Sequence, residues 1–129
     1  MNTPNNLKYA KTDEWVKLDG SIATIGVSDY AQDQLSDIVF IEFNRETDDA
    51  VAKGDALATI ESVKAAGDVN SPVSGKVLEV NEGLSDIPET INVDPYEKGW
   101  LYKIEVSDPS EVDDLMDAAA YDKYCEGRH

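Results

Sequence analysis

The chain has 129 residues, of which 41% are hydrophobic, so it is long enough to close a single core and we expect one domain spanning 1–129. Its formal net charge of −16 would be repelled by a phosphate backbone or an anionic lipid surface, which excludes nucleic acid and membranes as expected partners. The same charge favours encounters with basic patches on larger proteins. Because Cys125 is the single cysteine, the sequence excludes an intramolecular disulfide and a cysteine-based metal cluster.

The N-terminal residues help to predict the cellular compartment of the protein. The first fifteen residues have neither the apolar core of a secretory signal nor the Arg-rich pattern of a transit peptide. No apolar run approaches the length that crosses a membrane, and a lone cysteine fits a reducing compartment. We therefore expect a bacterial cytoplasm, or the mitochondrial matrix if the sequence is a trimmed eukaryotic chain. Residues 1–6 are expected to form a flexible N-terminus.

Short β-type segments dominate the first hundred residues. They alternate apolar and polar side chains, as strands with one buried face do, and turn-forming residues such as Ser71-Pro72 separate them. The expected strands cover 21–27, 37–43, 55–61, 75–80 and 100–106. A faint repeat, in which FIEFN at 40–44 returns as VLEVN at 77–81, predicts two similar β units that face each other.

Two helices are expected to interrupt this pattern. The first covers 28–35 and has Ser28 as its N-cap. The second is expected to run over 108–125, with Asp108 as its cap and Pro109 at the first helical position. An apolar stripe along this second helix, interpreted as core packing, consists of Val112, Leu115, Met116 and Ala119.

Lys64 lies between two of the expected strands, in the stretch ESVKAAGDVNSPVSG at 61–75. Gly67 supplies backbone freedom near a chain reversal, so we expect a hairpin with Lys64 exposed near its tip. Exposed lysines are usually just solvated, which leaves open an acidic adaptor whose hairpin is a plain surface feature. An enzyme with Lys64 as an amine nucleophile is also open, but it needs a desolvated lysine in a pocket, which a hairpin of small residues does not favour.

The sequence resembles the H proteins of the glycine cleavage system. The similarity rests on LKYAKTDEWV at 7–16, ATIGVSDYAQDQLSDIVFIE at 23–42, GD at 54–55, ESVKAAGDVNSPVSGKVLEVNEGL at 61–84, NVDPYEKGWLYKI at 92–104 and EVDDLMDAAAYDKYC at 111–125. The resemblance implies a mainly β fold, a barrel-sandwich hybrid like those of lipoyl and biotinyl carriers, with two short sheets, a short internal helix and a C-terminal helix. The family's lipoylated lysine falls on Lys64.

The resemblance implies a non-catalytic carrier that bears lipoate covalently on Lys64. In the family, the lipoyl arm visits glycine decarboxylase, which is a pyridoxal phosphate enzyme, a tetrahydrofolate-dependent aminomethyltransferase, and dihydrolipoyl dehydrogenase. It carries an aminomethyl group between the first two. A lipoate-attaching enzyme is a further implied partner, and we expect the carrier to be a monomer. A carrier limited to lipoyl relay, never loaded by glycine decarboxylase, is the alternative within the same chemistry.

Five further residues are assigned by the same resemblance. Glu61, together with Val63 and Ala65, is expected to help the lipoate-attaching enzyme to recognise the hairpin. Glu14 and Asp68 are expected near the docked, loaded arm, where a carboxylate can pair with the protonated amine and hold it away from water. For each of the three acidic residues the alternative is an ordinary solvated carboxylate.

The sequence departs from the family pattern at three places. Asp13 stands where a histidine is usual, Ser36 stands where a glycine is usual, and the loop at 44–53 lacks the proline and glycine that normally shape it. These departures leave open the loop conformation and the fine structure of the cleft that receives the arm. They do not touch the hairpin. Trp15 and Trp100 are interpreted as large core side chains.

Overall fold

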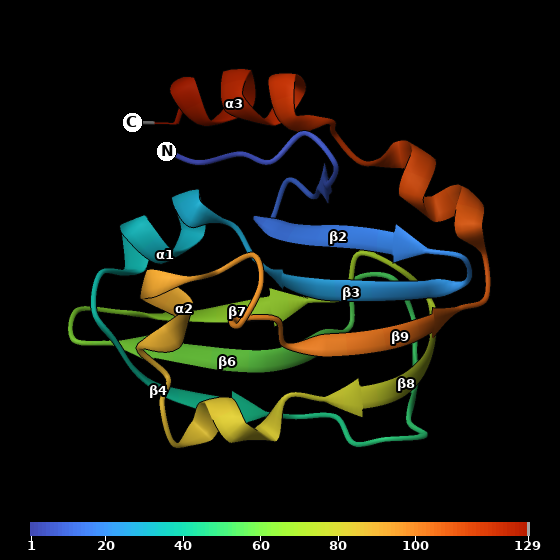
Figure 1. The fold of residues 1–129 in the computed structure, drawn as a ribbon, viewed down its shortest axis with the longest axis horizontal. Helices are drawn as coiled ribbons and strands as arrows, with labels where there is room; N and C mark the ends of the chain where they lie inside the picture. Colours follow the sequence, from blue (N-terminus) through green and yellow to red (C-terminus); the bar gives the residue numbers. More distant parts are fainter. Residues whose placement is uncertain (129) are drawn as a thin grey trace.

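The computed structural model describes residues 1–128, which form two antiparallel sheets packed against each other, with helices at their edges (Figure 1). The larger sheet has the strand order β1-β2-β3-β9-β8-β5, and the smaller sheet has the order β4-β6-β7. Neither sheet closes on itself. The expected fold class, a mainly β barrel-sandwich hybrid with two sheets, is confirmed.

The elements are short. The strands are β1 (Lys8–Tyr9), β2 (Glu14–Asp19), β3 (Ile22–Val27), β4 (Ile38–Phe43), β5 (Ala50–Val51), β6 (Ala56–Ser62), β7 (Ala66–Asn70), β8 (Gly75–Val80) and β9 (Tyr102–Val106). The helices are α1 (Asp29–Leu35), α2 (Thr90–Val93) and α3 (Ala118–Glu126), with 3-10 turns η1 (Glu82–Ser85) and η2 (Pro109–Asp114).

The core lies between the two sheets. Ile25 of β3 and Ile104 of β9 point inward from the larger sheet, and they belong to the same buried cluster as Ile41 of β4 and Ile60 of β6. Each of these four side chains is at most 2% exposed. Burying a side chain of this size contributes about 1.5–3 kcal/mol, so the two sheets stabilise each other mainly through this layer. The two copies of the sequence repeat lie one in each sheet, in β4 and β8.

The five expected strands are present as β3, β4, β6, β8 and β9, with ends within two residues of those predicted. Strand β2 was not predicted, and its burial does not alternate along the strand: Glu14 to Val16 are buried, whereas Lys17 to Asp19 are exposed. The two-residue strands β1 and β5 are too short to leave a periodic signal.

The interpretation of Trp15 as a core side chain is confirmed, since it is 1% exposed. Its ring N–H donates to the carbonyl of Pro95 at 2.9 Å, and its ring lies flat against Gly26. A Cβ at Gly26 would stand 2.7 Å from the ring, so no other residue fits there. Trp100 is only half-buried, with the Lys103 ammonium 5.0 Å from its ring centroid.

Helix α1 begins as the sequence predicted. The Ser28 hydroxyl accepts a hydrogen bond from the Ala31 N–H at 3.1 Å, and it lies 2.6 Å from the Tyr121 hydroxyl. Because an N-cap oxygen satisfies a backbone donor that has no partner within the helix, Ser28 fixes where α1 starts. The contact with Tyr121 also attaches the start of α1 to α3.

The prediction of one helix over 108–125 is wrong. The structure has η2, which Asp108 caps, and a separate helix α3 that begins after Asp117, whose carboxylate accepts from the Ala120 N–H at 2.8 Å. Between them, Met116 is extended and exchanges two backbone hydrogen bonds of 2.8 Å with Tyr9. Of the apolar stripe, Val112 is buried and Leu115 and Met116 are partly buried against the two clusters, but Ala119 is exposed, so core packing is wrong for Ala119. The backbone N–H and carbonyl of Met116, however, are hydrogen-bonded to Tyr9 of strand β1, so Met116 cannot belong to a helix.

The first residues of the chain contact α1 and α3. The Asn2 N–H donates to the Asp29 carboxylate at 2.7 Å, and the Thr3 hydroxyl donates to Asp122. The Tyr9 hydroxyl donates to the Pro4 carbonyl at 2.7 Å. Flexibility of residues 1–6 stays a prediction.

The loop at 44–53 takes its shape from aspartates. The Asp49 carboxylate accepts from the Glu46 N–H at 2.7 Å, and the Asp55 carboxylate accepts from the Ala52 N–H at 2.8 Å. Each bond closes a short turn of the kind that Asp and Asn side chains favour. The turn at Glu46–Asp49 forms without the proline and glycine that the resemblance led us to expect in this loop.

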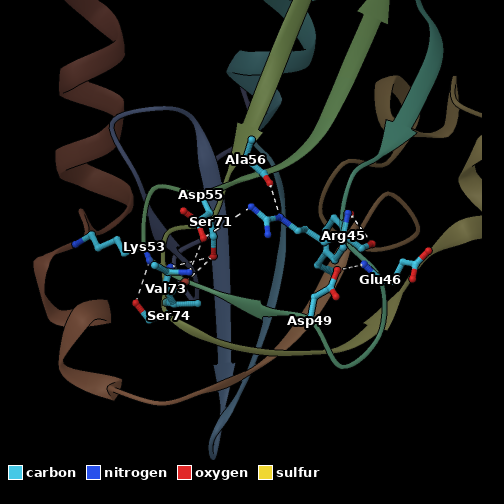
Figure 2. A network of polar contacts seen from close by, with 11 residues as sticks. Arg45, Glu46, Asp49, Lys53, Asp55, Ala56, Ser71, Val73 and Ser74 are labelled. Atoms are coloured by element: carbon cyan, nitrogen blue, oxygen red, sulfur yellow. Dashed lines mark hydrogen bonds and ion pairs between the residues drawn. The ribbon is translucent and has the colours of Figure 1, made fainter.

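Further contacts attach this loop to the sheets, as Figure 2 shows. The Arg45 guanidinium donates to the Ala56 carbonyl at 3.1 Å and lies 3.8 Å from the Asp55 carboxylate. The Lys53 N–H donates to the Ser74 hydroxyl at 2.9 Å. The loop is therefore connected to the start of β6 and to the segment before β8.

Ser36 occupies a backbone conformation that suits glycine. Its φ is 67° and its ψ is −148°, where a Cβ atom is strained by about 1–3 kcal/mol. Ser36 ends α1, and its N–H donates to the Gln32 carbonyl at 3.0 Å. This is the position at which the resemblance led us to expect glycine.

We expect Ser36→Gly to raise the free energy of unfolding by about 1 kcal/mol, because relief of the strain outweighs the added entropy of the unfolded chain. Urea denaturation measures this difference. The matched control is Ser107→Gly, at an exposed position without positive φ, where the same substitution should lower stability. Equal effects of the two substitutions would contradict the strain argument.

Candidate functional site

The hairpin that carries Lys64 is built by β6 and β7. The strands pair up to Glu61 opposite Ala66, and the turn is closed by the Ser62 N–H, which donates to the Ala65 carbonyl at 2.8 Å. The Ser62 hydroxyl accepts from the N–H groups of Lys64 at 3.3 Å and of Ala65 at 3.1 Å. The turn is therefore ordered by its own polar groups. In Figure 1 it projects beyond the body of the protein, beneath α1.

The Lys64 side chain is exposed, as the sequence predicted. Within residues 1–128 its ammonium group has neither an ion pair nor a hydrogen bond, so nothing in the described structure competes for the amine. Glu61, Val63 and Ala65, which were assigned to recognition, are exposed as well, and Val63 is 68% exposed. The Val63 N–H donates to the Asp37 carbonyl at 3.0 Å, which attaches the turn to the start of β4.

A pocket of about 350 Å³ lies beside this hairpin, between β2, α1 and β7. Both carboxylates that were expected near the arm, Glu14 and Asp68, line it. The structure thus brings together two residues that are far apart in sequence. The other lining residues are Thr12, Asp13, Val27, Tyr30, Ala31, Gln34, Leu35, Ile60, Gly67, Val69 and Arg128.

Glu14 is the buried polar group of this pocket, with a side chain 1% exposed. One carboxylate oxygen accepts from the Thr12 hydroxyl, and the other accepts from the Asn70 N–H at 3.1 Å. Burial raises the pKa of Glu14 to about 7; the hydrogen bonds from Thr12 and Asn70 oppose this shift, and the nearby charge of Asp13 adds to it. Near neutral pH the carboxyl is therefore poised between its neutral and charged forms.

The second expected carboxylate has a different environment. Asp68 is exposed, and it accepts a hydrogen bond from the Thr59 hydroxyl at 3.2 Å. Because solvent screens an exposed charge, Asp68 can attract a cation toward the pocket but holds it less tightly than Glu14.

The wall of the pocket between these carboxylates is largely apolar. Val27, Leu35, Ile60 and Val69 contribute to it, and Gly67 adds no side chain. Lys64 precedes Gly67 by three residues, so at most about 11 Å separates the Cα atom of Lys64 from that of this lining residue. The arrangement suits an apolar chain, attached at Lys64, that ends in a cation.

Two further residues at this pocket were not assigned from the sequence. The Arg128 guanidinium contacts both oxygens of the Asp13 carboxylate, at 2.5 and 2.9 Å. Asp13 was noted only as a departure from the family pattern, and Arg128 carried no signal because its partner lies 115 residues away.

The single thiol of the chain is not among the residues that line this pocket. Cys125 of α3 is 2% exposed and belongs to a second buried cluster with Tyr9, Trp15 and Tyr121. Burial raises the pKa of this thiol, so it stays protonated near neutral pH.

Within residues 1–128, no group of three or more acidic, cysteine or histidine residues is placed to hold a metal ion. Among the helices of that range, none has the length and hydropathy that a membrane span requires.

Comparison with known proteins agrees with this geometry. The profile of the glycine cleavage H-protein family matches residues 7–128. Glycine cleavage system H protein 2, mitochondrial, of Arabidopsis thaliana is 50% identical over 121 residues, which cover 94% of this chain and 77% of that protein. The mitochondrial glycine cleavage system H protein of Oryza sativa subsp. indica is 52% identical over 122 residues, which cover 95% of this chain and 74% of that protein.

A solved structure is similar as well. The crystal structure of a glycine cleavage system H protein from Mycobacterium marinum superposes with a TM-score of 0.83 at 30% identity, covering 97% of this chain and 98% of that one. Sequence and fold therefore agree over nearly the whole length. The chain belongs to the glycine cleavage H-protein family.

Proposed function

We propose that this protein is the lipoyl carrier of a glycine cleavage system, and that it transfers the aminomethyl group of glycine from glycine decarboxylase to aminomethyltransferase. The observation that carries the proposal is the placement of Lys64, exposed and unpaired within the described residues, three residues before Gly67 of a pocket that is also lined by the buried Glu14. Dihydrolipoyl dehydrogenase and a lipoate-attaching enzyme are the remaining proposed partners.

The residues present fit lipoate bound to Lys64 through an amide. When bound, lipoate supplies a ring disulfide that opens when a nucleophile attacks one sulfur. The amide removes the charge of Lys64, and the apolar wall of Val27, Leu35 and Ile60 can then contact an alkyl arm without facing a buried ammonium group.

Glu14 gives this pocket its preference for an amine cargo. A protonated amine that enters the pocket favours the charged form of Glu14 and lowers its pKa from about 7. Thr12 and Asn70 hold the two carboxylate oxygens in place while the amine pairs with them. The pair is screened little because Glu14 is buried, so the cargo is held out of water.

The exposed residues of the hairpin have a separate role. We assign Glu61, Val63 and Ala65 to recognition by the lipoate-attaching enzyme, because they surround Lys64 and are all accessible. The ordered turn at Ser62 presents the amine in one position, which lowers the entropy lost when an enzyme binds it.

The alternatives are less well supported. An enzyme with Lys64 as nucleophile needs a desolvated amine, and this amine is exposed. An adaptor or a relay limited to the lipoyl group would have no use for a buried carboxylate beside the hairpin. A non-catalytic monomeric carrier is therefore proposed. Its location, bacterial cytoplasm or mitochondrial matrix, stays a prediction; the two plant relatives are named mitochondrial.

Lys64→Arg should abolish both lipoylation and glycine cleavage, because a guanidinium cannot form the amide under the same ligase chemistry. The intact mass of protein from a lipoate-competent host and a reconstituted glycine cleavage assay measure these two losses. Lys8→Arg, at another exposed lysine, is the control and should change neither. Full activity of the Lys64 variant would overturn the proposal.

Glu14→Gln should shorten the half-life of the aminomethyl cargo about tenfold at pH 8, because a neutral amide cannot pair with the amine and a charge-assisted hydrogen bond is worth about 1.5–3 kcal/mol. Mass spectrometry of the loaded protein over time measures the loss. Asp68→Asn is the matched control and should have a smaller effect, since Asp68 is exposed. An unchanged half-life in the Glu14 variant would remove Glu14 from the proposed role.

Glu14 should also make the stability of the unloaded protein depend on pH. Its folded pKa of about 7 lies above its ordinary value of 4.5, so the folded state binds the proton more tightly and loses stability as pH rises from about 4.5 through 7. Glu14→Gln should remove this loss, so the variant should gain on the parent by up to about 3 kcal/mol across that range. Urea denaturation at pH 5 and pH 8 measures it, and parallel pH profiles of the two proteins would contradict the assignment.

A further inference from the structure

We propose that Arg128 is a positioning residue of the arm pocket, and that its ion pair with Asp13 holds the segment after α3 against the pocket and retains the cargo there. The inference rests on the proposed carrier function. It concerns residues that neither the sequence pattern nor the family resemblance assigned.

Arg128 and Asp13 form a bidentate ion pair between a guanidinium and a carboxylate. Two N–H groups meet two carboxylate oxygens, at 2.5 and 2.9 Å, and this paired geometry fixes orientation as well as distance. The side chains are only 28% and 16% exposed, so solvent screens the pair less than it screens surface ion pairs. Both residues line the same pocket as Glu14.

Arg128 also connects separate elements around the pocket. Its guanidinium carbon lies 4.6 Å from the ring centroid of Tyr30 in α1 and 4.8 Å from that of Tyr124 in α3. Cations above aromatic rings at these distances are attracted to them. One side chain thus joins α1, α3 and the turn before β2 along one side of the pocket.

Asp13 is itself held firmly. Its carboxylate accepts from the Tyr121 hydroxyl at 2.8 Å, and its carbonyl accepts from the Ser28 N–H at 2.9 Å. Its φ of 79° is an unfavourable conformation that these contacts maintain. Because Asp13 directly precedes Glu14, a shift of Asp13 would displace the buried carboxylate that receives the amine.

The pair also governs the charges that surround Glu14. The charged groups lining the pocket with Glu14 are the carboxylates of Asp13 and Asp68 and the guanidinium of Arg128. The charge of Asp13 already raises the pKa of Glu14. Without Arg128, the Asp13 charge would lose its partner, and Glu14 would become harder to ionise and less able to bind an amine.

The experiment compares Arg128→Gln, Asp13→Asn and the double variant with the parent protein. In the unlipoylated chain, the pKa of Glu14, measured by carbon-detected NMR titration, should rise in Arg128→Gln and return toward the parent value in the double variant. In the loaded protein, the half-life of the aminomethyl cargo should fall several-fold in Arg128→Gln. Arg128→Lys, which keeps the charge but not the paired geometry, should restore the pKa and only part of the half-life.

Lys53→Gln is the matched control, because it removes an ion pair of 3.8 Å to Asp114 outside this pocket and should leave both readouts unchanged. A lower melting temperature of Arg128→Gln with unchanged Glu14 pKa and cargo half-life would reduce Arg128 to a structural role and overturn the inference. Should Arg128→Gln not fold, the cargo half-life of Arg128→Lys decides instead: a half-life equal to that of the parent would overturn the inference. Failure of the parent protein to accept lipoate would overturn the carrier function instead, and the titration would still test the effect of Arg128 on Glu14.

Discussion

A carboxyl group buried beside an apolar pocket is the constraint on which the proposed carrier depends. Removing the charge of Glu14 from water is costly, and two donors, the Thr12 hydroxyl and the Asn70 N–H, offset only part of that cost. A cationic group that enters the pocket can offset the rest of this desolvation cost. The pocket therefore favours a cationic ligand next to the Glu14 carboxylate.

The proposed carrier has to meet two opposite requirements. In that function the hairpin of β6 and β7, both in the smaller sheet, is accessible to several enzymes, whereas the group attached to it is shielded between visits. Because β7 forms both one arm of the hairpin and one wall of the pocket, a single strand satisfies both requirements. The rigid core between the sheets keeps this strand at a fixed distance from β2, which carries Glu14. In the proposed carrier, the packing of the sheets thus places the cargo pocket beside the hairpin.

The sequence correctly predicted those features that depend on residues close together in the chain. The hairpin around Lys64 and the Ser28 cap each depend on residues close in sequence, and both were found as expected. The helix over 108–125 failed because the backbone of Met116 is bound to distant Tyr9. The burial of Glu14 and the pairing of Asp13 with Arg128 likewise depend on contacts made through the fold, and no periodicity marks them. The resemblance placed Glu14 and Asp68 near the arm, yet only the structure separates a buried carboxylate from an exposed one.

The burial of Cys125 has a consequence for the proposed lipoyl carrier. A carrier that exposes a reactive disulfide on a flexible arm is at risk of attack by any thiolate on its own surface, which would trap the arm as a mixed disulfide. The only sulfhydryl of this chain is enclosed beneath aromatic rings and kept protonated. Attack of Cys125 on the disulfide of such an arm is thereby prevented in two ways. The thiol is sterically inaccessible, and a neutral thiol is a weak nucleophile.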